Sequence, residues 1–227
     1  MGMGRSFFVT GTDTEIGKTT ITAGLITKAI SMGYTAVGLK PVAAGKILID
    51  DEFINEDVHA LRSVSVPSIS AADICAVELS EACAPHIAAR KEGIFLSSDV
   101  IINHVRAGQK HADISFVEGV GGFKIPLEDN WWSSDLARDL NLPVILVVGV
   151  RLGCINHAIL TSDSVKSLGL ELCGWVGNVV DSEFENIEEN IDTIGSAISS
   201  PCIGIVPFLT KPSPARVSEF LSLDLIL

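Results

Sequence analysis

Short apolar runs rich in β-branched residues alternate with segments of helical period along most of this chain. The strands predicted from these runs are residues 7–10, 35–39, 114–117, 144–148, 172–180 and 203–206. The predicted helices are residues 18–32, 57–64, 98–107, 134–140, 156–168 and 187–198. Parallel strands need crossover connections and are buried on both faces, so they read as continuous apolar runs. The alternation therefore predicts an α/β fold with a mostly parallel β-sheet flanked by helices.

The predicted elements form one continuous series, with no internal repeat, linker or low-complexity tract between them. A chain of 227 residues is long enough for one sizeable α/β core and short for two. We therefore expect a single domain over residues 1–227. Residues 43–56 are expected to form an acidic loop. Residues 65–96 carry no readable pattern apart from a turn expected at Pro85.

The charge balance and the cysteines limit the classes of partner. The chain has 16 Lys and Arg residues against 28 Asp and Glu residues, a net charge of −12. Such a surface repels nucleic acids and anionic membranes, so neither is expected as a partner. The five cysteines are odd in number and lack a C-x-x-C pair, which does not suit a disulfide framework. The longest apolar run, residues 142–150, is too short to cross a bilayer, and we expect a cytoplasmic protein.

The segment at residues 10–20 joins the first predicted strand to the first predicted helix, and its residue types suit phosphate binding. A phosphate-binding loop needs inward-pointing backbone N–H groups, a helix N-terminus, a lysine for the phosphate oxygens and a hydroxyl for Mg²⁺. Gly17, Lys18 and Thr19 have the spacing that meets these needs. The first glycine, Gly11, comes one residue earlier than in the common motif, so this is a variant loop. We predict a P-loop NTPase-like fold in which Lys18 contacts the γ-phosphate and Thr19 contacts Mg²⁺.

An acidic residue, Glu118, stands at the exit of the predicted strand at residues 114–117. In phosphate-loop enzymes a carboxylate in this position holds the Mg²⁺ ion of the nucleotide. The residues that follow are Gly119, Val120 and Gly121, and the glycines allow the backbone to approach a nucleotide closely. Together with the phosphate loop, this pattern predicts that Glu118 is a functional residue.

Further segments follow these two motifs in a characteristic order. The full set is TGTDTEIGKT (10–19), LKPVAAG (39–45), NEDVHAL (55–61), VEGVGG (117–122), GVRLGCINHA (149–158) and GWVGN (174–178). In this order they resemble the dethiobiotin synthetase family, from Phe7 to about Leu209. The resemblance implies an ATP- and Mg²⁺-dependent ligase that closes a ureido ring on the vicinal diamine 7,8-diaminopelargonate. In that reaction CO₂ forms a carbamate on one amine, ATP phosphorylates the carbamate, and the second amine displaces phosphate.

The resemblance implies that two lysines stabilise the reacting anions, because the carbamate and the γ-phosphoryl group are both negatively charged. Lys18, Lys40 and Thr14 are the expected catalytic residues, and Thr14 and Glu15 line the loop beside the two lysines. A lone lysine before a proline is ordinarily solvated, so the role of Lys40 depends mainly on the resemblance. Lys40 also ends a predicted parallel strand, and ligands of such folds bind at the carboxyl ends of the strands.

The same resemblance implies metal ligands and nucleotide contacts. Thr19, Asp57 and Glu118 match the metal ligands of the family, and one hydroxyl with two carboxylates suits Mg²⁺. Asn178 is expected to read the adenine edge through its amide group. The expected nucleotide contacts are Glu15, Ile16, Gly17, Lys18, Thr19, Thr20, Asp57, Glu118, Gly119, Val120, Gly121, Asn178, Pro207, Phe208 and Leu209.

The substrate contacts implied by the resemblance are Lys40, Ala44, Arg151, Gly153, Cys154 and Asn156. The last four lie at the start of a predicted helix, whose free N–H groups suit the distal carboxylate of the substrate. In the family this element belongs to the partner subunit, so a homodimer with the substrate site at its interface is expected. Cys154 has no evident His or acidic partner and is expected to be a small packing residue.

A few positions depart from the family pattern. Ala44 stands where the family usually has a serine, so one hydroxyl contact to the substrate is missing, at a cost of about 1 kcal/mol. Arg151 replaces the commoner lysine and offers a fork suited to a carboxylate. Pro212 and Pro214 stand where polar residues are expected, so contacts to the base are doubtful there.

Two other classes of protein compete with this interpretation. A dimeric ATPase switch of the partitioning or septum-positioning type has a lysine early in its loop, in a K-G-G-x-G-K-T pattern. Residues 12–16 contain no lysine, and residues 218–227 contain no basic residue that would suit a membrane-binding tail. The nucleotide-binding half of a cobalt-corrinoid amide ligase would come with a glutaminase domain, which this sequence lacks. The dethiobiotin synthetase interpretation is therefore preferred, with the ATPase switch as its alternative.

Overall fold

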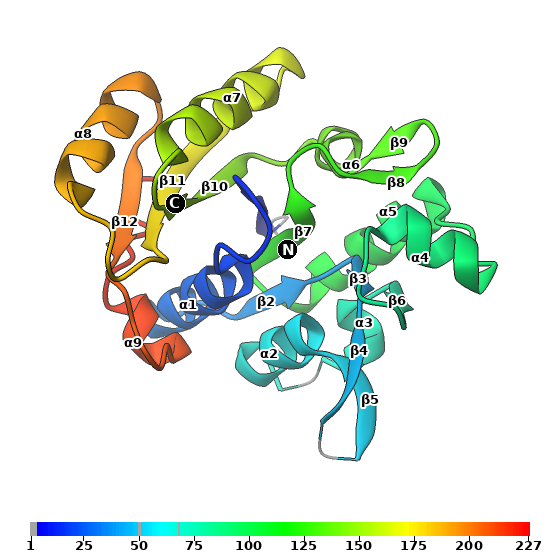
Figure 1. Ribbon diagram of the computed structural model, residues 1–227. Helices are drawn as coiled ribbons and strands as arrows, with labels where there is room; N and C mark the ends of the chain where they lie inside the picture. Colours follow the sequence, from blue (N-terminus) through cyan, green and yellow to red (C-terminus); the bar gives the residue numbers. More distant parts are fainter. Residues whose placement is uncertain (1–3, 50, 68) are drawn as a thin grey trace.

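A six-stranded sheet lies at the centre of the computed structural model, which describes residues 4–49, 51–67 and 69–227 (Figure 1). Its strands, in spatial order, are β12 (Cys202–Val206), β11 (Leu172–Val179), β10 (Val144–Val150), β1 (Arg5–Gly11), β7 (Ile114–Gly122) and β2 (Ala36–Leu39). Every neighbouring pair in this sheet is parallel. The α/β fold predicted from the alternating pattern is confirmed; residues 1–3, 50 and 68 of the predicted domain lie outside the described residues.

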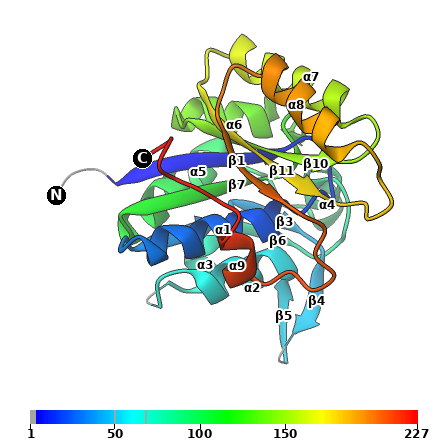
Figure 2. The ribbon, with the colours of Figure 1, turned by 90° about the vertical axis from the view of Figure 1, so that its left-hand side faces the viewer.

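Helices cover both faces of the sheet, as Figure 2 shows. One face is covered by α1 (Lys18–Ser31), α2 (Glu56–Val64) and α9 (Pro214–Ser218), and the other by α7 (Cys154–Ser167) and α8 (Ile187–Ala197). Further helices are α3 (Ala71–Ile74), α4 (Pro85–Glu92), α5 (Ser98–Gly108), the short 3₁₀ helix η1 (Gln109–His111) and α6 (Ser133–Leu140). In the part of the chain that the structure describes, none of the helices has the length and apolarity required to span a bilayer.

The central strands are apolar on both faces because helices exclude water from each side. Every residue of β10 is buried, and β1 and β7 contribute Phe8 and Phe116, which are fully buried. Phe7 stacks on Phe116, with the ring centroids 5.7 Å apart. Burial of each such side chain stabilises the fold by about 1.5–3 kcal/mol. This packing fixes the carboxyl ends of β1, β2 and β7 relative to one another.

The prediction of an acidic loop at residues 43–56 is wrong, because this segment contains three strands. Val42–Ala44 form β3, and Lys46–Ile49 and Glu52–Asn55 form the antiparallel pair β4 and β5. Leu48 lies opposite Phe53 across the pair. The apolar residues of both strands favour this pairing, whereas the acidic residues between them drew the prediction towards a loop.

The segment at residues 65–96, which the sequence pattern leaves open, contains α3, β6 (Val77–Leu79) and α4. Strand β6 pairs in parallel with β3, outside the central sheet. Pro85, where a turn is expected, is instead the first residue of α4, a position that suits proline because no intrahelical N–H donor is needed there. A small antiparallel pair, β8 (Pro126–Glu128) and β9 (Trp131–Trp132), follows β7.

Candidate active site

The phosphate loop connects β1 to α1 through residues 12–17. Gly17 has a φ of 80°, and a Cβ at this position would collide with Nδ2 of Asn178. Both facts require glycine here. The same Nδ2 donates a 2.8 Å hydrogen bond to the backbone oxygen of Ile16. Asn178, near the end of β11, therefore holds the loop immediately before α1 begins.

Lys18 is the first residue of α1, and its side chain is almost completely buried, with 6% of the residue exposed. Its Nζ donates a 3.4 Å hydrogen bond to the backbone oxygen of Asp13. Burial, followed by the repulsive charge of Lys40, lowers the pKa of this ammonium group to about 8. A bound phosphate would favour the charged form of Lys18, because an adjacent anion stabilises a cation at low dielectric.

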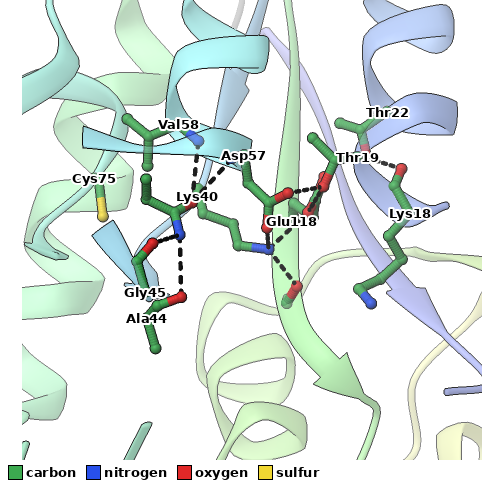
Figure 3. A network of polar contacts seen from close by, with 12 residues as sticks. Lys18, Thr19, Thr22, Lys40, Ala44, Gly45, Asp57, Val58, Cys75 and Glu118 are labelled. Carbon is green, nitrogen blue, oxygen red and sulfur yellow. Dashed lines mark hydrogen bonds and ion pairs between the residues drawn. The ribbon is translucent and has the colours of Figure 1, made fainter. Parts of the chain in front are cut away.

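A second cation, Lys40, directly follows β2 and lies against two carboxylates, Glu118 of β7 and Asp57 in the first turn of α2 (Figure 3). Its Nζ lies 2.7 Å from Oε1 of Glu118 and 2.8 Å from Oδ2 of Asp57, and it donates a 3.3 Å hydrogen bond to the backbone oxygen of Gly119. Oγ1 of Thr19 lies 2.7 Å from Oδ1 of Asp57 and 2.7 Å from Oε1 of Glu118. The structure therefore brings the predicted residues Thr19, Lys40, Asp57 and Glu118 into one cluster.

Burial and charge act in opposite directions on this cluster. Burial tends to lower the pKa of Lys40, but the charges of Glu118 and Asp57 more than offset it and raise the pKa above its ordinary value. Burial tends to raise the pKa of Asp57, whereas the charge of Lys40 and the hydrogen bonds from Lys40 and Thr19 hold it below its ordinary value. Lys40 and Asp57 are therefore both charged at neutral pH.

The oxygen atoms of the cluster fit a divalent cation. Oε2 of Glu118 is buried and has no hydrogen-bond partner among the described residues, and a cation would satisfy it. Thr19, Asp57 and Glu118 offer one hydroxyl and two carboxylates, the hard oxygen donors that Mg²⁺ prefers. Over residues 4–49, 51–67 and 69–227, no group of three or more His, Cys, Asp or Glu side chains converges on one point. A Mg²⁺ ion held here would therefore take its other ligands from phosphate and water.

A cavity of about 850 Å³ opens in front of the cluster. The predicted site residues that line it are Thr14, Glu15, Gly17, Lys18, Thr19, Thr20, Lys40, Ala44, Asp57, Glu118, Val120 and Gly121. Two predicted residues, Ile16 and Gly119, do not line the cavity. Ile16 is buried, and the backbone oxygen of Gly119 accepts a hydrogen bond from Lys40. The cavity thus joins a phosphate-binding loop, two buried ammonium groups and a set of oxygen ligands.

Comparisons with known proteins identify the family. A family model described as an AAA domain matches residues 5–216. The ATP-dependent dethiobiotin synthetase of Ralstonia nicotianae is 44% identical over 205 residues, which is 90% of each chain. The enzyme of the same name from Cellvibrio japonicus is 43% identical over 223 residues, 98% of each chain. The chain belongs to the dethiobiotin synthetase family.

Membership of the dethiobiotin synthetase family makes the chain an ATP-dependent ligase of biotin biosynthesis, as the resemblance implies. Solved structures of other P-loop proteins share its fold. The septum site-determining protein MinD of Pyrococcus horikoshii is 16% identical with a TM-score of 0.57, covering 99% of this chain and 89% of its own. A ParA family ATPase of Chlorobium tepidum is 11% identical with a TM-score of 0.56, covering 95% and 97%. At these identities the likeness concerns the fold alone, so it lends no support to the ATPase-switch alternative.

The predicted substrate residues at the start of α7 lie apart from the main cavity. Arg151 forms a 2.5 Å ion pair with Asp13 and lines a separate cavity of about 560 Å³ beside the phosphate loop. Gly153 precedes α7, Cys154 is buried, and Asn156 lies in the first turn of the helix; none of the three lines either cavity. These residues therefore do not line the main cavity together with Lys40 and Ala44.

The predicted contacts to the adenine base are also not gathered at the main cavity. Pro207, Phe208 and Leu209 follow β12 and line neither of the two cavities. Nδ2 of Asn178 has two N–H donors, and one of them donates to the backbone oxygen of Ile16. The structure assigns Asn178 a role in shaping the loop that the sequence does not indicate.

Several residues that line the cavity were not predicted from the sequence. These additional lining residues include Ile47, Asn55, Ser80, Ala82 and Cys83. They come from the β4–β5 pair and from the segment between β6 and α4. Their position depends on the pairing of β3 with β6, which joins residues far apart in the sequence. Of these five residues, Asn55 alone lies in a sequence motif quoted above, NEDVHAL.

Proposed function

We propose that the main cavity is the site at which this dethiobiotin synthetase joins CO₂ to 7,8-diaminopelargonate. The observation that carries the assignment is that Lys18 and Lys40 line the same cavity. The Nζ of Lys40 also lies 2.7 Å from Oε1 of the buried Glu118. Each reacting partner is an anion, and buried cations lower the repulsion between a carbamate and a γ-phosphoryl group.

The reaction has three steps. One amine of the substrate attacks CO₂ and loses a proton, which gives the carbamate. A carbamate oxygen then attacks the γ-phosphorus of ATP, and ADP leaves. The second amine attacks the carbonyl carbon, phosphate leaves, and the ureido ring is closed. In this scheme Lys18 holds the γ-phosphoryl oxygens and Lys40 holds the carbamate oxygen.

We propose Thr19, Asp57 and Glu118 as the residues that hold Mg²⁺. The orphaned Oε2 of Glu118 and the three converging side chains support this assignment. Bound Mg²⁺ would supply charge compensation for the phosphates. The N–H groups at the start of α1 and the Lys18 ammonium would orient the same phosphates.

We propose a homodimer in which a second subunit contributes Arg151, Gly153, Cys154 and Asn156 to the substrate site. The support is that none of the four lines the main cavity of its own chain, and that the neighbouring Leu152 is 87% exposed. We also propose that the backbone of residues 207–209 flanks the adenine base. A cytoplasmic location fits the five free cysteines and the net charge of −12.

The function is tested by following dethiobiotin, ADP and phosphate together. With the diamine, bicarbonate, ATP and MgCl₂ present, the three products should form in equal amounts. Omission of the diamine should reduce ADP formation to the background rate, because the carbamate acceptor is then absent. ATP hydrolysis at the same rate with and without the diamine would overturn the assignment and favour an ATPase switch.

A further inference from the structure

Asn55 is a buried residue whose side chain is fully engaged at the edge of the main cavity. It ends β5 and is the N-cap of α2, and 6% of it is exposed. Its Oδ1 accepts hydrogen bonds from the backbone N–H of Asp57 at 3.0 Å and of Val58 at 3.4 Å. This is the usual contact of an N-cap residue, and by itself it would make Asn55 a structural residue.

The other half of the Asn55 amide contacts the cavity wall. Nδ2 donates to the backbone oxygens of Ala44 at 3.1 Å and Gly45 at 2.8 Å. Figure 3 shows these two carbonyl groups on one side of the start of α2, and Asp57 extends from the same helix towards Lys40 and Glu118. Gly45 has a φ of 89°, and a Cβ there would lie 2.9 Å from Cβ of Ala82, so the backbone of the wall is tightly constrained.

One side chain therefore connects two parts of the site. Ala44 and Gly45 line the substrate side of the cavity, and Asp57, two residues after Asn55, lies in the charged cluster. Only an amide of this length offers an acceptor to the helix N-terminus and two donors to the wall at the same time. Aspartate or serine would cap α2 equally well but could not donate to both carbonyl groups.

We propose that Asn55 is a positioning residue of the ligase reaction, which sets the substrate-side wall at Ala44 and Gly45 relative to the Asp57 carboxylate. The proposal rests on the proposed function of the cavity. Loss of the two donors leaves two carbonyl groups without their partner and allows the wall to shift. A shift of the wall changes the binding of the diamine, whereas the phosphate loop, which Asn55 does not contact, is unaffected.

The test compares Asn55→Ser and Asn55→Asp with the wild-type enzyme. Both variants keep a helix cap, and the serine variant adds no charge. We expect the KM for the diamine to rise about tenfold in both, with the KM for ATP within twofold of the wild-type value. We also expect faster hydrogen exchange of backbone amides at residues 43–48 in the ligand-free protein. Exchange requires no substrate and therefore tests the contact independently of the reaction.

Ser70→Ala is the matched control. Ser70 caps α3 by accepting from the N–H of Asp73 at 3.2 Å, and it does not line the cavity. Its loss should lower the thermal midpoint without changing either KM. An unchanged diamine KM and unchanged exchange in Asn55→Ser would overturn the proposal, as would misfolding of both Asn55 variants, which would show a purely structural role. Absence of product from the wild-type enzyme would instead refute the proposed function.

Discussion

The ammonium nitrogen of Lys40 lies 2.7 Å from Oε1 of Glu118, and the two side chains are 4% and 0% exposed. A buried ion pair adds little net stability, but removing one partner leaves an uncompensated charge and costs about 3–5 kcal/mol. Lys40 therefore compensates Glu118 and Asp57 in the ligand-free protein, in addition to the contact with the carbamate proposed above.

Lys40→Gln is expected to lower both turnover and stability. Turnover should fall by orders of magnitude, because the carbamate loses its cation. Without Mg²⁺ the free energy of unfolding should fall by about 3 kcal/mol, since Glu118 is then buried without compensation. Addition of MgCl₂ should restore more stability to the variant than to the wild-type protein. Urea denaturation with and without MgCl₂ measures both effects.

The control for this prediction is Lys91→Gln. Lys91 pairs with Glu81 at 2.5 Å, but both side chains are about half exposed, so the pair is solvated. Solvated pairs contribute little to stability. This variant should unfold at the wild-type urea concentration with and without MgCl₂. If Lys40→Gln behaved in the same way, the buried ion pair would not be a structural element of the site.

Lys18→Met is expected to weaken nucleotide binding strongly while stabilising the ligand-free protein. The pKa of Lys18 is lowered from 10.5 to about 8 by burial and by Lys40, so a charged Lys18 opposes folding at pH 7. Methionine fills a similar volume without charge, and the free energy of unfolding should rise by on the order of 2 kcal/mol. Calorimetry should show that ATP binding weakens at least ~100-fold, since a charge-assisted contact to phosphate is lost. A variant less stable than wild type would contradict this account of the buried cation.

The central sheet and the phosphate loop could be predicted because their signals are local. A fully buried strand such as β10 is a continuous apolar run, and Gly17 to Thr19 stand between a strand and a helix. The topology then brings the ends of parallel strands to one edge, which places Lys40 beside Glu118. Asp57 follows no such strand, and only the family resemblance pointed to it.

The remaining wall of the site could not be predicted because it depends on contacts between distant segments. Strand β3 pairs with β6, some 35 residues later in the chain, and each strand has only three residues. Such short strands carry no periodic pattern of their own. The ion pair between Arg151 and Asp13 is likewise invisible in the sequence, since its partners are 138 positions apart.

Ala44→Ser is expected to improve substrate binding. Ala44 lines the cavity, and its backbone oxygen is held by Asn55, so a hydroxyl at this position would point from a fixed wall. One additional hydrogen bond is worth about 1 kcal/mol, which corresponds to a fall in the diamine KM of roughly fivefold. Initial rates over a range of diamine concentrations measure this change. An unchanged KM would show that no substrate group lies near residue 44.

The stability of the protein should fall in alkali through Cys75. This thiol is buried and donates to the backbone oxygen of Val77 at 3.3 Å, and burial raises its pKa from 9.0 to about 12. The unfolded chain therefore loses the thiol proton at lower pH than the folded protein does. The stabilisation is fully present below pH 9 and declines as the pH rises from 9 towards 12, by about 1.4 kcal/mol per pH unit.

Cys75→Ala removes this titration and provides the measurement. Urea denaturation under reducing conditions, at pH values from 8 to 11, gives the free energy of unfolding of both proteins. The stability difference between wild type and variant should be constant up to about pH 9 and shrink above it, because only the wild-type chain can ionise at residue 75. If the stability difference between the two proteins did not change over the whole pH range, the thiol would ionise as readily in the folded protein as in the unfolded chain. That result would contradict the prediction, because the folded thiol is buried, with 8% of the residue exposed.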